Sequence, residues 1–205
     1  PTANMNNFVK RTLSGIGFAA VMLAAFLTNK YIFGAVMLFS LVVMMWEFLK
    51  MTCGKEYRYS QILSIVAGAS LFTLVYFYRG FGLPGRLVIL AFVPIFILMI
   101  NSLYVKDKSR FNKFANLYTA IIYISVPWSL LNFAAFSPEG NFSGMLLLCF
   151  FAIIWGSDVG AYLFGITLGQ KYGKKLFPSI SPKKSWIGFW GGLLTSVIVA
   201  VLLNK

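Results

Sequence analysis

The chain has 205 residues, of which 59% are hydrophobic and 11% charged, whereas soluble domains average about 45–50% apolar and about 25% charged residues. A soluble globule of this size could not bury so much apolar surface, and a disordered chain needs low hydrophobicity and many charges, so an integral membrane protein remains. The net charge of +13 sits in short loops between apolar runs, which favours an anionic membrane surface and phosphate-bearing ligands over nucleic acid.

Seven apolar stretches are predicted to span the membrane, since a span needs about 20 mostly apolar residues. They cover residues 12–28, 31–49, 62–78, 87–104, 117–136, 143–168 and 187–203. Only Asn29 and Lys30 separate the first two, which predicts a tight helical hairpin. Pro94 and Pro127 lie inside the fourth and fifth spans, where we expect kinks. The predicted fold class is all-α, a polytopic transmembrane helix bundle of about seven spans.

The basic residues are divided unevenly between the two sides of such a bundle. The amino terminus and the loops 50–61, 105–116 and 169–186 hold 14 of them, and the alternate segments hold 4. By the positive-inside rule, the amino terminus and these three loops are expected to be cytoplasmic. The loop 137–142 has no basic residue and is expected to face outward.

Glycine content divides the chain further, within what we expect to be a single integral membrane domain over 1–205. Eight of the 18 glycines fall between Gly156 and Gly192. Small residues let helices approach closely and let backbone reach a ligand. Residues 12–136 are therefore predicted to be scaffold helices, and the last fifty residues are predicted to carry the site.

The chain has no histidine, which removes the usual imidazole base and the commonest zinc ligand. Its two cysteines form no CxxC motif and are interpreted as unpaired thiols. Glu47 follows Trp46 at the end of the second span, and interfacial anchoring is its favoured interpretation. All carboxylates available for metal or acid–base work are Glu47, Glu56, Asp107, Glu139 and Asp158.

Asp158 is the one carboxylate that lies deep inside a predicted membrane span. It lies in the sixth span, about 11 residues and so roughly 16 Å from the cytoplasmic loop. An ionised carboxylate there costs several kcal/mol unless it is paired, solvated or bound to a metal. A protonated or lysine-paired structural Asp is one interpretation. Ser157, Gly156 and Gly160 would surround Asp158 with a small polar notch, which favours a divalent-cation ligand, and oxygen ligands suit magnesium.

The loop 169–186 is polar and rich in lysine, and it ends in Ser-Pro-Lys-Lys-Ser immediately before the last span. A positive-inside anchor would explain the charge alone. The order of the residues favours a phosphate-binding site, because hydroxyls, lysines and free backbone N–H groups at a helix N-terminus suit an anionic phosphate. The spacing does not match a Walker loop.

These motifs together resemble the bacterial phosphatidate cytidylyltransferases, the CDP-diacylglycerol synthases. The resemblance rests on Ser157-Asp158-x-Gly-Ala-Tyr162, Ile180-Ser-Pro-Lys-Lys-Ser-Trp186 and Gly188-Phe-x-Gly-Gly192. It implies a multi-pass enzyme of the bacterial inner membrane that transfers the cytidylyl group of CTP to phosphatidate, releasing pyrophosphate and requiring Mg²⁺. Residues 143–205 would then begin the catalytic half, with 169–186 as its cytoplasmic loop.

The resemblance also implies roles for individual residues. Asp158 would be the metal ligand and, with Lys183 and Lys184, catalytic. The implied partners are CTP, phosphatidate and membrane lipid, without nucleic acid, and a homodimer stays open. The residues implied to bind substrate are Ser157, Ser181, Lys183, Lys184 and Ser185.

The chain departs from the family pattern in two places. Ile187 stands where the family usually has Glu, and the family's C-terminal Asp-rich segment has no counterpart before Lys205. We therefore expect the chain to be part of a longer protein. Two alternatives stay open at this point: a homologue that binds nucleotide or acidic lipid without turnover, and a small-solute transporter with a buried Asp as its coupling site.

Overall fold

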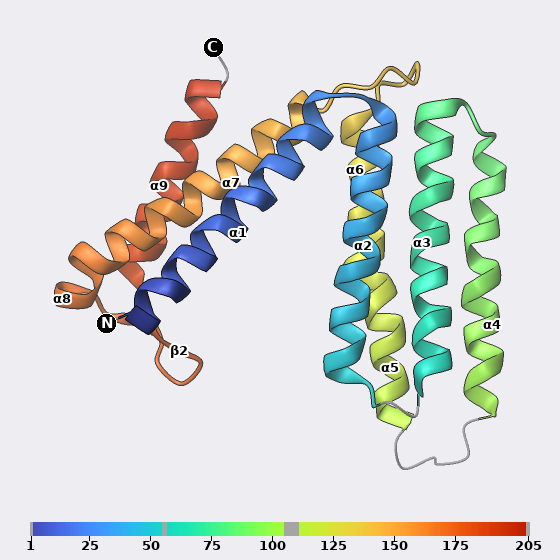
Figure 1. Ribbon diagram of the computed structural model, residues 1–205, viewed down its shortest axis with the longest axis horizontal. Coiled ribbons are helices and arrows are strands. Elements are labelled where there is room, and N and C mark those ends of the chain that lie inside the picture. The colour runs from blue at the N-terminus through green and yellow to red at the C-terminus, as the bar shows by residue number, and fades with distance from the viewer. Residues whose placement is uncertain (1, 55–56, 105–110, 204–205) are drawn as a thin grey trace. The chain divides into compact units, whose positions relative to one another are not determined.

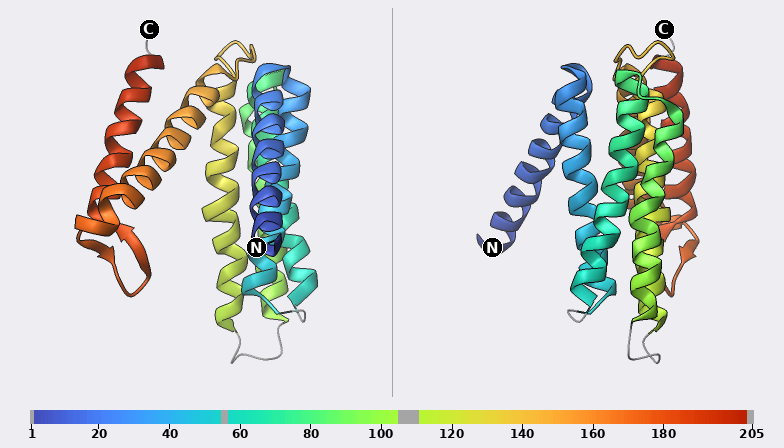
Figure 2. Two further views of the ribbon diagram at one scale, coloured as in Figure 1. Left: turned by 60° about the vertical axis from the view of Figure 1, so that its left-hand side comes forward. Right: turned by 90° about the vertical axis from the view of Figure 1, so that its right-hand side faces the viewer.

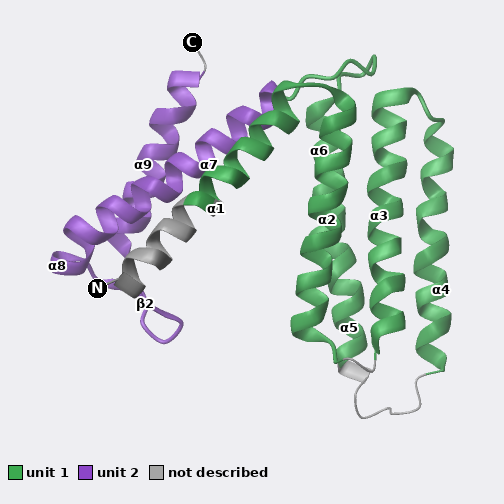
Figure 3. Cartoon of the chain, in the orientation of Figure 1, with its two compact units in different colours: residues 1–144 green, residues 145–205 purple. Residues whose placement is uncertain are grey.

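The structure is a computed structural model that describes residues 2–54, 57–104 and 111–203. Glu56 and Asp107 lie outside the described residues, as does the first half of the basic loop 105–116. The chain divides into two compact units, Pro1–Gly144 and Met145–Lys205 (Figure 3).

Each of the seven predicted spans falls on a helix (Figure 1). Six helical stretches are long and apolar enough to cross a membrane, and Gly15–Leu27 is a shorter apolar helix among the described residues. The all-α, polytopic fold is therefore confirmed. Unit 1 contains α1 (Thr2–Leu27), α2 (Lys30–Thr52), α3 (Arg58–Phe81), the 3₁₀-helix η2 (Gly85–Ala91), α4 (Phe92–Leu103), α5 (Phe111–Ala120), the π-helix η4 (Ile121–Ser125) and α6 (Val126–Ala135). Unit 2 contains α7 (Met145–Phe164), the π-helix η5 (Gly165–Gly169), α8 (Gln170–Tyr172), β1 (Lys175–Phe177), β2 (Ser181–Ser185) and α9 (Trp186–Leu203).

The core of unit 1 forms around α2 and α3, which run side by side (Figure 2). Helix α4 packs against α3, and the α5–α6 segment packs against both α2 and α3. The buried residues of α2 recur every four positions, and such an i±4 row forms a ridge that packs into the groove of a neighbouring helix. The row consists of Phe33, Met37, Leu41, Met45 and Leu49, none more than 1% exposed. As predicted, α1 and α2 are joined tightly, and the Asn29 side chain accepts hydrogen bonds from the Tyr31 and Ile32 N–H groups.

Polar side chains connect these helices through backbone carbonyls. The Ser64 hydroxyl of α3 donates to the Leu117 carbonyl at 2.8 Å, and the Ser125 hydroxyl donates to the Gly68 carbonyl at 2.9 Å. The Trp128 indole N–H donates to the carbonyl of Met37. Small hydroxyls and buried donors of this kind hold membrane helices together where lipid tails give no hydrophobic driving force.

Both prolines predicted to kink a span lie where the helix changes type. Pro94 is in the first turn of α4, directly after the 3₁₀-helix η2, and Pro127 is in the first turn of α6, directly after the π-helix η4. Proline lacks the N–H that an α-helix interior needs, but the first turn leaves that group without an intrahelical partner. The change of helix type is therefore how each span accommodates its proline.

Unit 2 is built on a close contact between α7 and α9 through glycines on both helices. A Cβ on Gly192 would lie 2.9 Å from the Ser157 carbonyl oxygen, and one on Gly188 would lie 3.0 Å from the Ala161 carbonyl oxygen. Glycines on α7 match them: a Cβ on Gly160 would collide with Thr195. The predicted close approach of helices at the glycine cluster is thus confirmed.

A short β-hairpin connects the two helices where the sequence indicated only a loop. The helix runs on through η5 and α8 to Tyr172, and then β1 pairs antiparallel with β2. Ser185 ends β2 and caps α9: its buried hydroxyl accepts a hydrogen bond from the Gly188 N–H at 3.2 Å. The Trp186 N–H donates to the Lys174 carbonyl at 3.0 Å. The hairpin is therefore fixed to the start of α9 by both its ends.

We predict that Gly192→Ala destabilises the protein whereas Gly165→Ala does not. The new methyl at residue 192 meets backbone of α7, so the helices must separate, and overpacking of this kind costs about 1–3 kcal/mol. A Cβ on Gly165 finds its nearest neighbour at 4.0 Å. Thermal unfolding of the detergent-solubilised variants measures the difference, and equal midpoints would contradict the glycine contact.

We also predict that Ser185→Ala lowers the free energy of unfolding by about 1 kcal/mol, because the Gly188 N–H loses its acceptor. Ser179→Ala is the matched control, since Ser179 is an exposed hydroxyl in the turn of the same hairpin. SDS titration of the two variants compares their stabilities. A Ser185→Ala variant as stable as the control would show that the cap contributes nothing.

Candidate functional site

Asp158 lies on α7 beside the contact with α9 but not in it. Ser157 packs against Gly192, and Asp158, one residue further, emerges about 100° around the helix from that face. Asp158 is exposed in the structure. Within the described part of the chain, no lysine or arginine forms an ion pair with it. The interpretation of Asp158 as a lysine-paired structural residue therefore finds no partner lysine there.

Most of the positive charge of unit 2 lies on the hairpin and just before it. Five lysines lie on α8, the hairpin and the segment between them, and all are exposed: Lys171, Lys174, Lys175, Lys183 and Lys184. No acidic residue follows Asp158 in the sequence. The lysines therefore have no carboxylate nearby in sequence, and their field is available to an anionic ligand.

Lys183 and Lys184 are presented by an irregularity of the hairpin. The strands pair at Lys175–Ser185 and at Phe177–Ser181, so β2 advances by four residues while β1 advances by two. The two lysines lie in the resulting bulge with Pro182, which suits a bulge because it has no N–H to pair. Bulges redirect side chains and are frequent beside active sites.

Ser181 and Ser185 mark the two ends of β2 and differ in access. Ser181 is half-buried, whereas Ser185 is buried against Gly169, on which a Cβ would collide with the Ser185 hydroxyl. The cap bond and the bond from Trp186 use two of the backbone N–H groups that the sequence suggested were free for phosphate. The structure thus leaves the lysines, rather than the start of α9, as the accessible phosphate-binding groups.

The helix contacts set the depth of Asp158 relative to the hairpin. Ser185 lies against Gly169, and Gly192 lies against Ser157. Ser185 and Gly192 are seven residues apart, which corresponds to about 10 Å along the axis of α9. The structure therefore places the lysine hairpin at one end of the α7–α9 pair and Asp158 about two turns further along it.

The other two carboxylates that the structure describes belong to unit 1. Glu47 is exposed on α2 of unit 1, and Glu139 lies in the loop before α7. Within the described residues, no group of three or more His, Cys, Asp or Glu side chains could hold a metal ion. A cation at Asp158 would therefore depend on ligand oxygens for most of its coordination.

Sequence reasoning missed the hairpin, its bulge, the cap at Ser185 and the π-helical turn η5. The Ser-x-x-Gly sequence from Ser185 to Gly188 contains a hydroxyl suited to an N-cap immediately before an apolar run, and this signal could have identified the start of α9. The bulge has no comparable sequence signal.

Comparison with known proteins agrees with the sequence motifs. The sequence model of the cytidylyltransferase family matches residues 9–205. The phosphatidate cytidylyltransferase of Rickettsia bellii is 41% identical over 88 residues, which are 43% of this chain and 36% of the relative. That of Rickettsia felis is 33% identical over 155 residues, 73% of this chain and 60% of the relative. That of Staphylococcus epidermidis is 34% identical over 93 residues, 45% and 35% of the two chains.

The chain thus spans between about a third and three fifths of the length of these relatives. None of the solved structures gives a significant match. The family match covers nearly the whole chain, including Asp158 and the hairpin. The chain belongs to the cytidylyltransferase family.

Proposed function

We propose that this chain takes part in transferring the cytidylyl group of CTP to phosphatidate, which yields CDP-diacylglycerol and pyrophosphate. The observation that carries the proposal combines two features of unit 2. One is a carboxylate within a membrane span, which pairs with no lysine or arginine that the structure describes, and the other is a lysine-bearing bulge at the end of the same helix pair. The names of the relatives support the choice of reaction. They do not favour the alternatives, a binding-only homologue and a small-solute transporter.

The proposed reaction needs charge neutralisation more than acid–base chemistry. A phosphatidate oxygen attacks the α-phosphorus of CTP, a new P–O bond forms, and the bond to the β-phosphate breaks. Phosphatidate already carries an ionised oxygen, so no base is needed, which suits a chain without histidine. Lys183 and Lys184 would bind phosphate oxygens and stabilise the charge that develops on pyrophosphate.

The residues present fit a magnesium ion that is held mainly by phosphate oxygens of the bound substrate. Mg²⁺ is commonly bound through one or two carboxylates together with substrate phosphates and water. Asp158 provides one carboxylate, and its exposed position leaves room for phosphate oxygens. When bound, the ion would act as a Lewis acid on the phosphate oxygens. Ser157, half-buried beside Asp158, would help to orient this cluster.

In the proposed reaction CTP approaches from the cytoplasm. We infer that the enzyme is located in the bacterial cytoplasmic membrane, with its amino terminus and the hairpin on the cytoplasmic side, since basic loops favour that side. The lipid substrate would reach Asp158 laterally through the bilayer, while the nucleotide would meet the hairpin lysines first.

We predict magnesium-dependent formation of CDP-diacylglycerol from CTP and phosphatidate by the purified chain in detergent. Asp158→Asn should lower the rate by roughly 100-fold or more, because a preorganised electrostatic group at the reacting phosphates is removed. Glu47→Gln is the matched control, since it removes an exposed carboxylate from α2, and it should retain the parental rate. Radiolabelled CTP incorporated into lipid measures the product. Equal rates for Asp158→Asn and the parent would refute the role of Asp158.

We further predict that Lys183→Gln and Lys184→Gln each weaken CTP binding by about 10-fold, as expected for loss of one charge-assisted hydrogen bond to phosphate. Lys171→Gln, which removes a charge from α8 outside the bulge, should have a smaller effect. Titration with CTP at two salt concentrations separates the bulge from general electrostatic attraction. If all three variants weakened CTP binding equally, and if these effects vanished in high salt, general electrostatic attraction alone would explain them.

A further inference from the structure

An apolar groove of about 300 Å³ lies between α2 and α3 of unit 1. It is located where α2 begins and α3 ends, next to the tight turn at Asn29 (Figure 1). Phe72 and Tyr76 are buried and line its inner side, whereas Tyr31, Phe77 and Phe81 are exposed. The residues that line it are Tyr31, Gly34, Ala35, Leu38, Phe72, Thr73, Tyr76, Phe77 and Phe81.

The groove is held in shape by contacts between its two helices. The Tyr76 hydroxyl donates to the Lys30 carbonyl at 2.8 Å. Gly34 makes room for the Tyr76 ring, because a Cβ there would lie 2.6 Å from Tyr76 Cζ. Tyr76 also stacks on Phe72, with ring centroids 6.2 Å apart and planes at 11°. The inner side is therefore preformed, as is usual for sites that bind small molecules.

A cation lies beside this groove. Lys30 Nζ is 4.1 Å from the ring centroid of Phe81 and 5.7 Å from that of Tyr31, two residues that line it. The Lys30 ammonium donates to the Gly80 carbonyl at 3.3 Å and forms no ion pair with any described carboxylate. Lys30 is also the first residue of α2, where the helix dipole already favours negative charge. Its remaining N–H donors are therefore suited to an anion.

The net charge of this end of the unit has the same sign. Lys30, Arg79 and Arg86 lie in the helix ends beside its short connections, against one acidic residue, Glu139, in the loop before α7. Arg79 donates to the Phe136 carbonyl at 2.8 Å. A hydrogen bond from Ser137 lowers the pKa of Glu139, with Arg79 as a lesser cause, so Glu139 is ionised at neutral pH. Three basic residues therefore stand against one ionised carboxylate, and the net charge beside the groove is positive.

We propose that the groove between α2 and α3 binds an anionic phospholipid, with an acyl chain along the aromatic side chains and the phosphate at Lys30. A free inorganic anion would gain nothing from the apolar surface, and a zwitterionic lipid would gain less from the surplus charge. Under the predicted topology, this end faces away from the cytoplasm. The proposed lipid is therefore a structural ligand distinct from the substrate that the hairpin lysines would meet.

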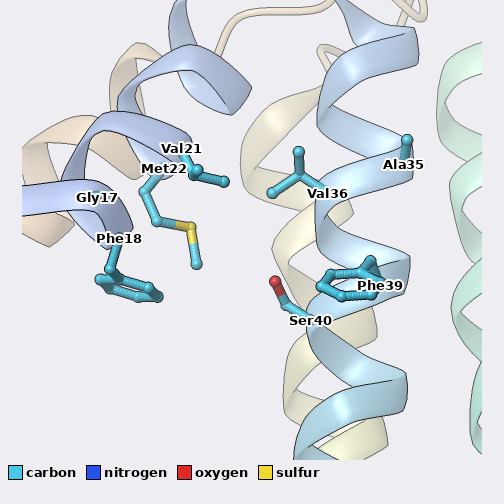
Figure 4. Close-up of a pocket in the computed structure, with 8 residues that line it drawn as sticks. All are labelled: Gly17, Phe18, Val21, Met22, Ala35, Val36, Phe39 and Ser40. Carbon is cyan, nitrogen blue, oxygen red and sulfur yellow. The ribbon is translucent and has the colours of Figure 1, made fainter. Parts of the chain in front are cut away.

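A second groove provides an internal comparison. It measures about 380 Å³ and lies between α1 and α2, where Met22, Val36 and Ser40 point toward the space between the helices (Figure 4). None of the residues that line it is charged: Gly17, Phe18, Val21, Met22, Ala35, Val36, Phe39 and Ser40. This groove has the apolar surface without the cation, so it should not select for an anionic lipid.

Native mass spectrometry of the full chain in detergent, titrated with phosphatidylglycerol or phosphatidylcholine, tests the proposal. Phosphatidylglycerol should bind more tightly, and Lys30→Gln should weaken it about fivefold, the effect expected of one basic residue near an anionic lipid. Thr73→Phe should fill the groove and also reduce binding. Two variants are matched controls: Arg86→Gln removes an exposed charge from the same end, and Ser40→Phe fills the comparison groove.

The site is supported if Lys30→Gln and Thr73→Phe lose phosphatidylglycerol while the two control variants keep it. Equal loss in Arg86→Gln would overturn it in favour of general surface charge, and equal binding of both lipids would overturn the anionic preference. The double variant Lys183→Gln/Lys184→Gln, which tests the proposed reaction, should bind phosphatidylglycerol normally. Loss of binding in that variant would place the lipid at the hairpin and overturn the proposal. Thermal unfolding of every variant checks that the fold is retained.

Discussion

The approach of α7 and α9 through facing glycines is the contact on which unit 2 depends. In lipid, helices gain little from burying apolar side chains, so close backbone packing and hydrogen bonds must hold them together. Gly188 and Gly192 bring α9 against the carbonyls of α7. The same approach brings Ser185 onto Gly169 and so sets where the hairpin starts. The positions of the lysines follow from a contact that carries no charge.

The spans were predictable because hydropathy reports directly on the solvent that each segment meets. Each predicted span falls on a helix, and the tight join at Asn29 follows from the shortness of the polar gap. The glycine cluster was also interpretable, since few structures other than close helix packing require so many small residues. In both cases local composition was sufficient.

The hairpin and the candidate site were less accessible to sequence reasoning. Ser-Pro-Lys-Lys-Ser has no alternation of apolar and polar residues, the usual signal for a strand. Its strand forms because the ends of two packed helices are close enough for a short connection to pair with itself. Asp158 and the lysines were identified by residue type. The bulge at Lys183, however, depends on how β1 pairs with β2, and the distance from Asp158 to the hairpin depends on the contacts between α7 and α9. The cap at Ser185 shows how a hydroxyl that suits phosphate can serve the fold.

The π-helical turn η5 (Gly165–Gly169) has a consequence for how the two parts of the site are aligned. A π-helical turn accommodates about one residue more than an α-helical turn, and one residue corresponds to about 100° of rotation. Everything after Gly169 is therefore out of phase with the helix that bears Asp158. A deletion of one residue in this turn would preserve every side chain of the site while changing the direction from which the hairpin meets its ligand. The angular setting of the hairpin is thus encoded in residue count rather than in residue identity.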